Sequence, residues 1–454
     1  MIGKKGIGSH RFHLTPVHTI VLFYFSAVTI SAILLSLPIA IQEGAKWTFL
    51  DAVFTAASAV SVTGLTTVST ADTFTTPGIF ILAFVLQFGG IGIMTLSTAI
   101  WMILGRKIGF KERQLIMTDQ NQVSFSGLVR LMKNILGLII AIELVGAFIL
   151  GTYYLQYFST VGEAFIQGFF GAVSATTNAG FDITGSSLVP YANDYFVQFI
   201  NIILMILGAI GFPVLIEVKD FLVHGKKKPY RYRFSLYTKL TTVTFFGLIV
   251  VGAVFILLFE WNHFFQGKTW HESLFYALFQ SVTTRNTGLS TMDVSEFTDS
   301  TNLVLSILMF IGASPSSVGG GIRTTTFALV LLMIYSFARG KSTIKVFKRE
   351  IHPDDMMKSV VVLNVALMIC FVAVITLAAI EPFPLISIIF EVASAFGTTG
   401  LSLGITADLS SFGKLIIIFL MFIGRIGILS FLFIARGTVR EEKVHYPKER
   451  VIIG

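Results

Sequence analysis

Ser58-Ala-Val-Ser-Val-Thr-Gly64-Leu65 is the first of four short segments that align on a glycine. The others are Ser174-Ala-Thr-Thr-Asn-Ala-Gly180-Phe181, Val282-Thr-Thr-Arg-Asn-Thr-Gly288-Leu289 and Ser394-Ala-Phe-Gly-Thr-Thr-Gly400-Leu401. The four glycines follow one another at intervals of roughly 110 residues, a period that indicates repeated structural units. The chain is therefore predicted to contain four fused repeats.

An apolar segment too short to cross a bilayer precedes each aligned glycine. We expect these segments to be re-entrant pore helices: Leu50–Val60, Ala164–Ser174, Leu274–Val282 and Leu385–Phe396. A second glycine follows each at a similar offset, at Gly89, Gly208, Gly312 and Gly424. Small residues also let membrane helices pack closely, but four matched pairs favour a repeat of helix, pore helix, glycine turn and helix. Irregular backbone at membrane depth needs protein or water around it, so the four turns are expected to line one cavity.

The composition is that of a membrane protein. Of 454 residues, 54% are hydrophobic, 13% are charged and 44 are Phe, which is more apolar mass than one soluble core requires. Uncharged stretches long enough to span about 30 Å of hydrocarbon recur, for example Ile20–Ile41, Ile79–Leu104 and Leu240–Phe259. We expect the first to be a retained helix, because it is longer than the apolar part of a signal peptide. The single cysteine, Cys370, argues against disulfides and a cysteine-based metal site.

The net charge of +8 is spread unevenly along the chain. Lys and Arg gather at both termini and in segments 106–113, 226–233 and 339–349, whereas the alternate segments hold few cations. Basic clusters also occur in nucleic-acid-binding proteins, but this alternation fits the rule that cytoplasmic loops carry the positive charge. We therefore expect both termini in the cytoplasm, an even number of spans, contact with the lipid bilayer and no bound nucleic acid.

The predicted fold is an all-α polytopic membrane protein, with four fused helix–pore helix–helix repeats, eight transmembrane helices and one central pore. The expected segments are a cytoplasmic N-terminus at 1–15, repeats at 16–110, 111–228, 229–350 and 351–436, and a cytoplasmic C-terminal tail at 437–454. This arrangement predicts a multi-pass protein of the cell (plasma) membrane.

The glycine turns are the predicted selectivity filter. Glycine permits backbone angles that aim carbonyl groups at an axis, and carbonyls from four strands can replace the hydration shell of an alkali cation. The C-terminal ends of four pore helices add partial negative charge there. The expected ion-binding residues are Val62, Thr63, Gly64, Asn178, Ala179, Gly180, Asn286, Thr287, Gly288, Thr398, Thr399 and Gly400. Most of them are small and none is charged, which favours backbone recognition of potassium over a carboxylate ring.

Two charged side chains near this region need partners. Arg285 lies three positions before Gly288, where facing the axis would repel a cation in transit, so we expect it to point behind the filter. Its partner would be an acid such as Glu391 or a backbone carbonyl. Glu143 lies in mid-span, and either a polar neighbour or protonation would accommodate it, with a structural role favoured over a direct ion site.

At these residues the chain resembles the Trk/Ktr/HKT superfamily of potassium transporters, over about residues 15–436. With no extra helix pair before the first repeat, it resembles the membrane subunit of bacterial Ktr systems. With glycine at position 64, the chain resembles the potassium-permeable members of the superfamily, because sodium-selective plant relatives carry serine at that position. The resemblance implies K⁺ as substrate, Na⁺ as a stimulating ion, a homodimer with one pore per subunit, and a cytosolic ring of nucleotide-binding regulatory subunits of the KtrA or KtrC type.

No nucleotide site is expected in this chain itself. Gly340-Lys341-Ser342 ends like a phosphate-binding loop, but Tyr335 stands where the first glycine is needed. Nucleotide is therefore expected only on the regulatory partner.

The segment from Gly312 to Arg323 contains a proline and three successive glycines, so it is expected to unwind at bilayer depth, unlike the last helices of the other repeats. Arg425 aligns with Gly90, Ala209 and Ala313 and is expected to hang into the pathway below the filter. A passive kink and a helix-packing salt bridge are the alternatives. The predicted gate comprises Ala313, Ser314, Pro315, Ser316, Ser317, Val318, Gly319, Gly320, Gly321 and Arg425.

The sequence thus predicts a gated potassium-translocating subunit. A secondary cation transporter of a different fold is the alternative, because broken helices and intramembrane charges also occur there. A membrane enzyme is a third class, but the sequence offers no polar cluster or nucleophile elbow within the membrane, so no catalytic residue is expected.

Overall fold

The computed structural model describes residues 16–92, 108–109, 113–114, 117, 127–224, 233–341 and 343–435, with positions 447, 449 and 452. Within this part of the chain, four helices are long and apolar enough to cross a membrane. They are α1 (Pro16–Leu35), α7 (Leu128–Tyr154), α11 (Leu236–Glu260) and α15 (Pro353–Ile380). One of them lies near the start of each predicted repeat.

A shorter helix follows each long one. These helices are α2 (Phe49–Ser61), α8 (Val161–Thr176), α12 (Trp270–Thr283) and α16 (Leu385–Gly397). Helix α2 begins at a capping box in which Thr48 and Asp51 satisfy each other's backbone N–H groups. Thr160 caps α8, and Thr269 caps α12, in the same position relative to the helix. All four helices fall where the sequence predicts pore helices.

A further helix completes each repeat, and each is interrupted at a glycine or followed closely by one. The first parts are α4 (Thr76–Gly90), α9 (Tyr195–Ala209), α13 (Asp299–Ile311) and α17 (Ser411–Ile426). The continuations are α10 (Phe212–His224), α14 (Thr324–Ala338) and α18 (Ile428–Ala435). Positive φ angles occur at Gly92 (88°), Gly211 (103°) and Gly427 (88°). The expectation that only the third repeat is interrupted is therefore wrong, although its break, residues 312–323, is the longest of those described.

The predicted number of eight spans remains a prediction. Helices α9 and α10 bend by 106° at Gly211, and counting them as one span raises the four helices of spanning length to five. Residues 93–104 of the predicted span Ile79–Leu104 lie outside the described part, as do residues 1–15 and most of 437–454. The basic residues of segments 106–113 and 226–233 lie mostly outside it as well.

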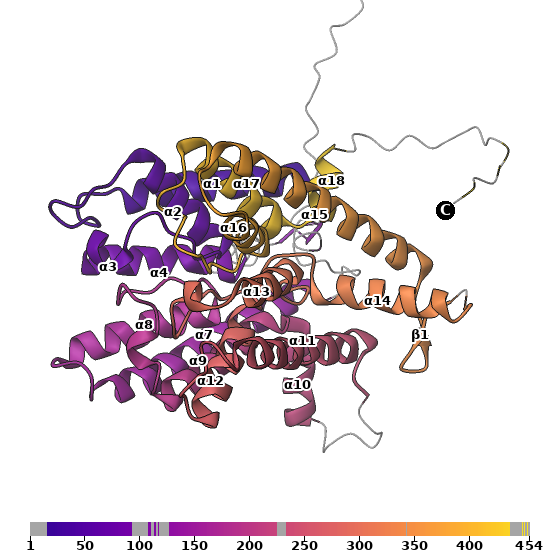
Figure 1. The fold of residues 1–454 in the computed structure, drawn as a ribbon, viewed down its shortest axis with the longest axis horizontal. Coiled ribbons are helices and arrows are strands. Elements are labelled where there is room, and N and C mark those ends of the chain that lie inside the picture. The colour runs from indigo at the N-terminus through magenta and orange to yellow at the C-terminus, as the bar shows by residue number, and fades with distance from the viewer. Residues whose placement is uncertain are drawn as a thin grey trace, which may run out of the picture.

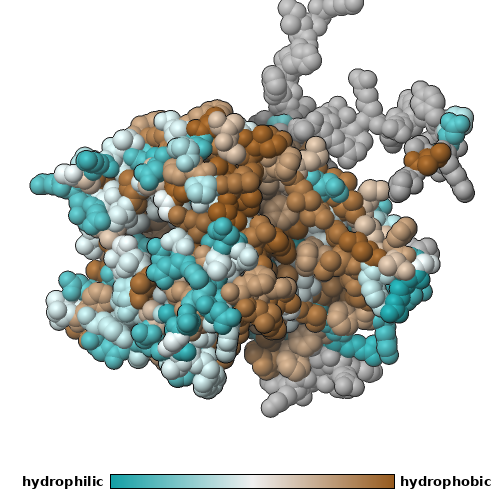
Figure 2. Space-filling model, in the orientation of Figure 1, coloured by the Kyte–Doolittle hydropathy of each residue, from teal (hydrophilic) through white to brown (hydrophobic). Residues whose placement is uncertain are grey.

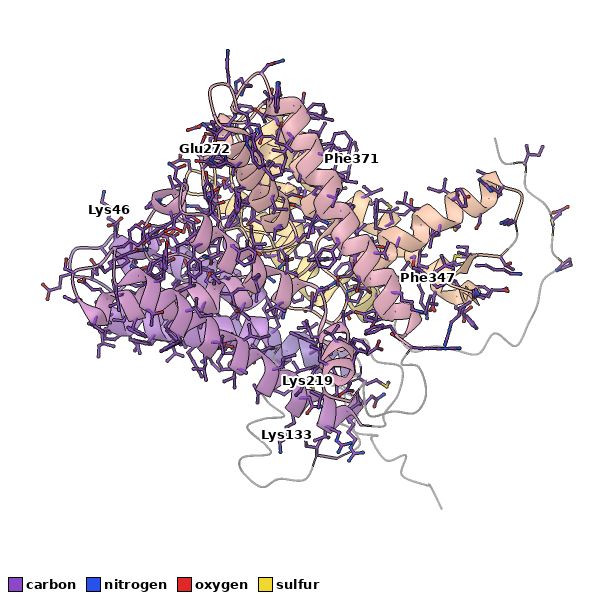
Figure 3. The ribbon with its side chains drawn as sticks, turned by 90° about the horizontal axis from the view of Figure 1, so that it is seen from below. Lys46, Lys133, Lys219, Glu272, Phe347 and Phe371 are labelled. Atoms are coloured by element: carbon purple, nitrogen blue, oxygen red, sulfur yellow. The ribbon has the colours of Figure 1, made fainter. Side chains whose placement is uncertain are left out.

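The surface has the character of a membrane protein. Figure 2 shows a hydrophobic band between two hydrophilic ends. Large apolar side chains on the long helices face outward, including Phe148 (65% exposed) and Phe371 (68% exposed), as expected of residues that contact lipid. In Figure 3, Lys46 and Glu272 lie nearer one end of the long axis than Lys219 and Phe347 do.

The repeats contact one another in a closed cycle. Figure 1 shows α2, near the start of the chain, close to α17, near its end. The last helix of each repeat packs against the short helix of the next: α4 against α8, α9 against α12, α13 against α16, and α17 against α2. The final contact returns to the first repeat, so the four short helices surround a common centre. The smaller elements are α3 (Thr70–Thr73), η1 (Val189–Tyr191), η2 (Val294–Glu296) and an antiparallel hairpin of β1 (Lys345–Val346) and β2 (Arg349–Glu350).

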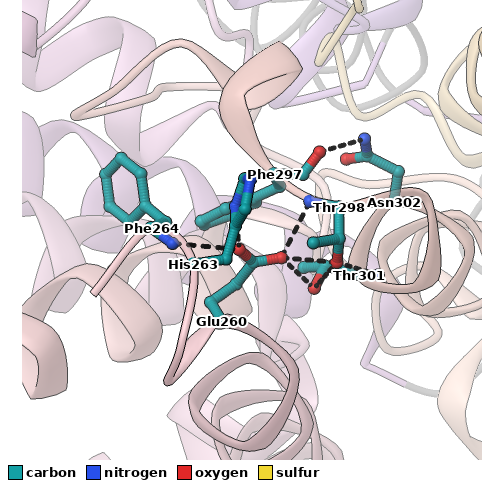
Figure 4. A network of polar contacts seen from close by, with 7 residues as sticks. All are labelled: Glu260, His263, Phe264, Phe297, Thr298, Thr301 and Asn302. Atoms are coloured by element: carbon teal, nitrogen blue, oxygen red, sulfur yellow. Dashed lines mark hydrogen bonds and ion pairs between the residues drawn. The ribbon is translucent and has the colours of Figure 1, made fainter. Parts of the chain in front are cut away.

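Two buried acids, Glu260 and Glu381, join pairs of helices, and Figure 4 shows the network of Glu260. Glu260, at the end of α11, accepts hydrogen bonds from the backbone N–H (2.9 Å) and the hydroxyl (2.7 Å) of Thr298, the N-cap of α13. In the fourth repeat, Glu381 accepts from the backbone N–H (3.1 Å) and hydroxyl (2.6 Å) of Ser410, the N-cap of α17. A carboxylate at a helix N-terminus also interacts favourably with the helix dipole.

Candidate ion pathway

The same unusual backbone geometry occurs at all four predicted filter strands. Two positions before each aligned glycine stands a non-glycine residue with positive φ: Val62 (59°), Asn178 (53°), Asn286 (130°) and Thr398 (50°). For β-branched Val62 and Thr398, positive φ is a strained conformation that the surroundings must impose. The aligned glycines themselves have φ between 68° and 92°.

The four aligned glycines form a closed ring, here called the glycine ring (Gly64, Gly180, Gly288 and Gly400). A methyl group added to any of them would collide with the backbone of the next strand. The collisions run in cyclic order: Gly64 against Ala179, Gly180 against Thr287, Gly288 against Thr399, and Gly400 against Thr63. Strands from four distant parts of the sequence therefore converge closely enough that only glycine fits.

Buried hydroxyl groups hold these strands from behind. Each bond joins a short helix to the backbone at or just after the glycine. Gly64 N donates to Ser58 Oγ (3.1 Å), Gly400 N to Ser394 Oγ (3.0 Å), Ser174 Oγ to Phe181 O (2.6 Å) and Thr283 Oγ1 to Leu289 O (2.6 Å). Among the described residues, the carbonyls of Thr63, Ala179, Thr287 and Thr399 accept no backbone hydrogen bond. These oxygens are therefore available to a ligand.

The second set of glycines packs helices together in three repeats. A Cβ atom on Gly89 or Gly424 would collide with the end of the short helix of the same repeat, at Ala59 and Phe396 respectively. Gly208 meets Thr176 in the same way. The third repeat differs, because Gly312 instead contacts Gly320 across the break. Close packing of small residues thus supports the strands in three repeats.

The break in the third repeat is an ordered loop (residues 312–323, the third-repeat loop) with partners on several helices. Its backbone N–H groups at Ser314 and Val318 donate to carbonyls at the end of α9, over 3.1 and 3.3 Å. Tyr237 of α11 donates its hydroxyl to Pro315 O (2.6 Å). The loop closes on itself where Ala313 N donates to Gly320 O (3.2 Å). This network is more than a kink in one helix would require.

Arg425 lies against this loop. Its guanidinium donates to the carbonyl of Val318 in the loop and to that of Gly89 on α4. Arg323 donates to the carbonyls of Ser314 and Gly319 from within the loop. Arg425 thus donates to backbone carbonyls of two elements, and within the loop Ser317 donates its hydroxyl to Ser314 O (2.6 Å).

A cavity of about 710 Å³ borders the third-repeat loop. Its lining includes loop residues Pro315 and Ser317, together with Tyr24 and Arg425. Asp355 and Lys358 of α15 also line it. Residues of the loop therefore form part of the wall of a space large enough for a hydrated cation.

Arg285 and Glu143 have the kind of partners that their positions require. Arg285 is fully buried and donates Nη2 to Leu308 O (2.6 Å), so the carbonyl is its partner. Of the two expected kinds of partner, Arg285 therefore has the carbonyl; among the described residues it forms no ion pair with Glu391, which accepts from the hydroxyls of Ser402 (2.8 Å) and Thr406. Glu143 on α7 accepts from Gln87 Nε2 on α4 (2.8 Å), a polar pair between helices.

Two residues of the loop network did not emerge from the sequence. Arg323 lies two positions after the last residue of the triple glycine, and a charge so close to a glycine run was the available signal. Tyr237 contacts Pro315 across 78 positions of the chain, and no local pattern marks it. The side chains of Asn178 and Asn286 also form hydrogen bonds that the sequence does not predict. A filter made of backbone carbonyls gives no reason to expect a role for these side chains.

An apolar belt and several helices of spanning length define a multi-pass membrane protein, in which four strands meet in a ring. Residues 14–444 match the family model TrkH, described as a cation transport protein. The chain belongs to this family of cation transport proteins.

Curated relatives match over nearly their whole length. The chain is 62% identical over 441 residues to Ktr system potassium uptake protein D of Bacillus subtilis, covering 97% of this chain and 98% of the relative. It is 36% identical over 444 residues to Ktr system potassium uptake protein B of the same organism, covering 97% of each. It is 33% identical over 451 residues to potassium/sodium uptake protein NtpJ of Enterococcus hirae, covering 98% of each.

A solved structure has the same fold. The crystal structure of the potassium transporter TrkH from Vibrio parahaemolyticus matches with a TM-score of 0.72 at 20% identity, over 94% of this chain and 86% of that chain. A transporter of a different fold is thereby disfavoured, and the family of transport proteins gives no support to a membrane enzyme.

Proposed function

We propose that this chain is the potassium-translocating subunit of a bacterial uptake system and that K⁺ crosses the membrane through the glycine ring. The relatives named as Ktr potassium uptake proteins support this substrate. The observation that carries the proposal is the closed ring, where four strands bring carbonyls with no backbone donor to one axis. Such oxygens substitute for the water around an alkali cation.

The filter in this proposal consists of the three residues that end at each ring glycine. The positive φ angles of Val62, Asn178, Asn286 and Thr398 support this assignment, because strained backbone persists where the surrounding structure enforces a particular geometry. The short helices end at these strands, and their C-terminal dipoles add attraction for a cation.

The membrane potential is a sufficient driving force for uptake. A potential is worth about 2.3 kcal/mol per charge per 100 mV, and about 1.4 kcal/mol corresponds to a tenfold concentration ratio. About 120 mV would therefore sustain roughly hundredfold accumulation of K⁺. No nucleotide hydrolysis by this chain is needed.

The third-repeat loop and Arg425 form the gate in this proposal, since Arg425 donates a hydrogen bond to the loop and both line the cavity. A homodimer and a cytosolic nucleotide-binding ring are the proposed partners, consistent with relatives that are named as parts of a Ktr system. A partner that binds residues 339–349 would act on the loop through α14, which connects the two. Na⁺ is proposed as an activator.

Flux measurements in proteoliposomes test the function. With an imposed negative interior potential, we expect the purified protein to take up K⁺ and to exclude Na⁺ by at least about tenfold, which corresponds to about 1.4 kcal/mol. Varying Na⁺ separately on each side distinguishes cotransport from stimulation. Equal fluxes of K⁺ and Na⁺, or no flux with the gate opened by loop deletion, would refute the proposal.

Cysteine labelling tests the orientation. In a Cys370→Ser variant, single cysteines at Asp72 and Glu272 should react with an impermeant reagent added to whole cells, whereas cysteines at Thr343 and Lys348 should react only after permeabilisation. The reason is that the basic segment 339–349 is expected in the cytoplasm. Labelling of Thr343 from outside would contradict the proposed topology.

A further inference from the structure

The side chain of Asn286 touches the third-repeat loop. It is completely buried, and its Oδ1 accepts hydrogen bonds from Gly320 N (2.7 Å) and from Thr398 Oγ1 (3.1 Å). Gly320 belongs to the loop, whereas Asn286 and Thr398 belong to the third and fourth filter strands. One oxygen atom therefore joins two filter strands to the loop.

Close packing reinforces this junction. A Cβ atom on Gly319 would collide with Asn286 Cγ, and one on Gly320 would lie 2.6 Å from Thr398 Oγ1. The loop therefore packs directly on the filter strands with no room for another atom. The backbone of Asn286 is also different, with φ at 130°, whereas the equivalent residues of the other strands lie between 50° and 59°.

Asn178 holds the same place in the second strand but has different partners. Its Oδ1 accepts from Thr287 Oγ1 in the third strand, and its Nδ2 donates to Met205 O on α9 (3.3 Å). Asn178 thus joins two filter strands to a helix, without a bond to the loop among the described residues. The two asparagines form a natural pair for comparison.

We propose that Asn286 is a positioning residue that couples the gate to the filter, because its amide oxygen holds the loop closed while bracing the fourth strand. This inference rests on the proposed function of the ring and loop. When the loop moves away, Oδ1 loses the Gly320 N–H and keeps only the Thr398 hydroxyl. The state of the loop is thereby communicated to two of the four filter strands through one side chain.

The hydrogen bond contributes to closure because losing it leaves the buried Gly320 N–H without an acceptor in the closed state. Closure is measured by a leak ratio. For each variant, this ratio is the K⁺ flux with the loop intact divided by the K⁺ flux of the same variant after deletion of Ser314–Gly320. This ratio cancels any effect of the substitution on permeation itself. Ala313 N and Gly320 O are hydrogen-bonded, so the ends of the deletion lie close together.

Asn286→Leu removes the acceptor at similar size and should raise the leak ratio about three- to tenfold, the range expected for one buried hydrogen bond. Asn286→Asp keeps the acceptor and loses only Nδ2, which has no partner among the described residues, so its ratio should match that of the parent. Asn178→Leu is the matched control and should also leave the ratio unchanged. Asn286→Ala replaces the Leu variant if the latter does not fold.

The outcomes separate this inference from the proposed function. If the parent conducts no K⁺ even after loop deletion, the proposed function fails. If the parent conducts but Asn286→Leu and Asn286→Ala keep the parental leak ratio, the coupling is overturned while the function stands. An equal rise in Asn178→Leu would also overturn it, because the effect would then be a general loosening of the filter.

Discussion

Gly288→Ser is expected to reduce the K⁺/Na⁺ permeability ratio at least tenfold or to abolish K⁺ flux. A serine Cβ would collide with Thr399 O in the neighbouring strand, and φ at 79° would strain any residue with a side chain by about 1–2 kcal/mol. Since about 1.4 kcal/mol is a tenfold change in an equilibrium, this strain alone is large enough to displace a coordinating carbonyl. Bi-ionic potentials or paired K⁺ and Na⁺ fluxes measure the ratio.

The control for this substitution needs a glycine outside the ring. Gly89 is unsuitable, because a Cβ there would collide with Val62 and Ala59 directly behind the first strand. Gly137, within α7, has no atom within 4 Å of an added Cβ, so Gly137→Ser should leave selectivity unchanged. A similar loss of selectivity in both variants would remove the ring from the pathway.

Arg425→Ala is expected to raise K⁺ flux in the absence of a regulatory partner by about tenfold or more. The guanidinium donates to carbonyls of the loop and of α4, and a hydrogen bond from a charged group contributes about 1.5–3 kcal/mol. Removing both bonds destabilises the closed loop, whereas the ring keeps its own supports, so the K⁺/Na⁺ ratio should stay at the parental value. Deletion of Ser314–Gly320 should have the same effect through the loop itself.

Arg425→Lys distinguishes two causes of a rise. A lysine keeps the positive charge in the pathway, but its single ammonium group does not reproduce the planar fork that bonds two carbonyls at once. If the bonds hold the gate, Lys should increase flux nearly as much as Ala. If Lys conducts no faster than the parent while Ala does, repulsion of the cation is the cause. No increase in either variant or in the loop deletion would make the loop a structural element.

The ring was predictable because glycine is required wherever the backbones meet. Gly64, Gly180, Gly288 and Gly400 are the visible trace of that contact, and their spacing identified the repeats. The positions of Arg425 and of the third-repeat loop followed from the same alignment. Whether the ring binds K⁺ and whether the loop moves remain predictions that the flux experiments test.

Other features depend on contacts that one sequence does not encode locally. The helices end near Gly92, Gly211 and Gly427, and each of these glycines lies three positions after a packing glycine. In a sequence, two glycines so spaced are equally typical of a continuous helix that packs closely against another, so they did not predict the breaks. The different roles of Asn178 and Asn286 arise from a backbone rotation and from distant partners. Arg285 donates to Leu308 O, whereas Glu391 accepts from the hydroxyls of Ser402 and Thr406, and no local pattern distinguishes these partners.

Helices α13 and α17 are fastened at one end and divided at the other. Glu260 and Glu381 tie their first turns to the preceding long helices, whereas residues 312–323 and Gly427 interrupt the chain after their last turns. A mechanical load on the far segments, α14 and α18, therefore bends the chain at these hinges before it reaches the fastened turns, because hinge motion is absorbed where few residues change their backbone angles. In the proposed function, the third and fourth filter strands precede α13 and α17 and so lie on the fastened side of these hinges, and a movement of α14 reaches them through the contact of Asn286 with the loop.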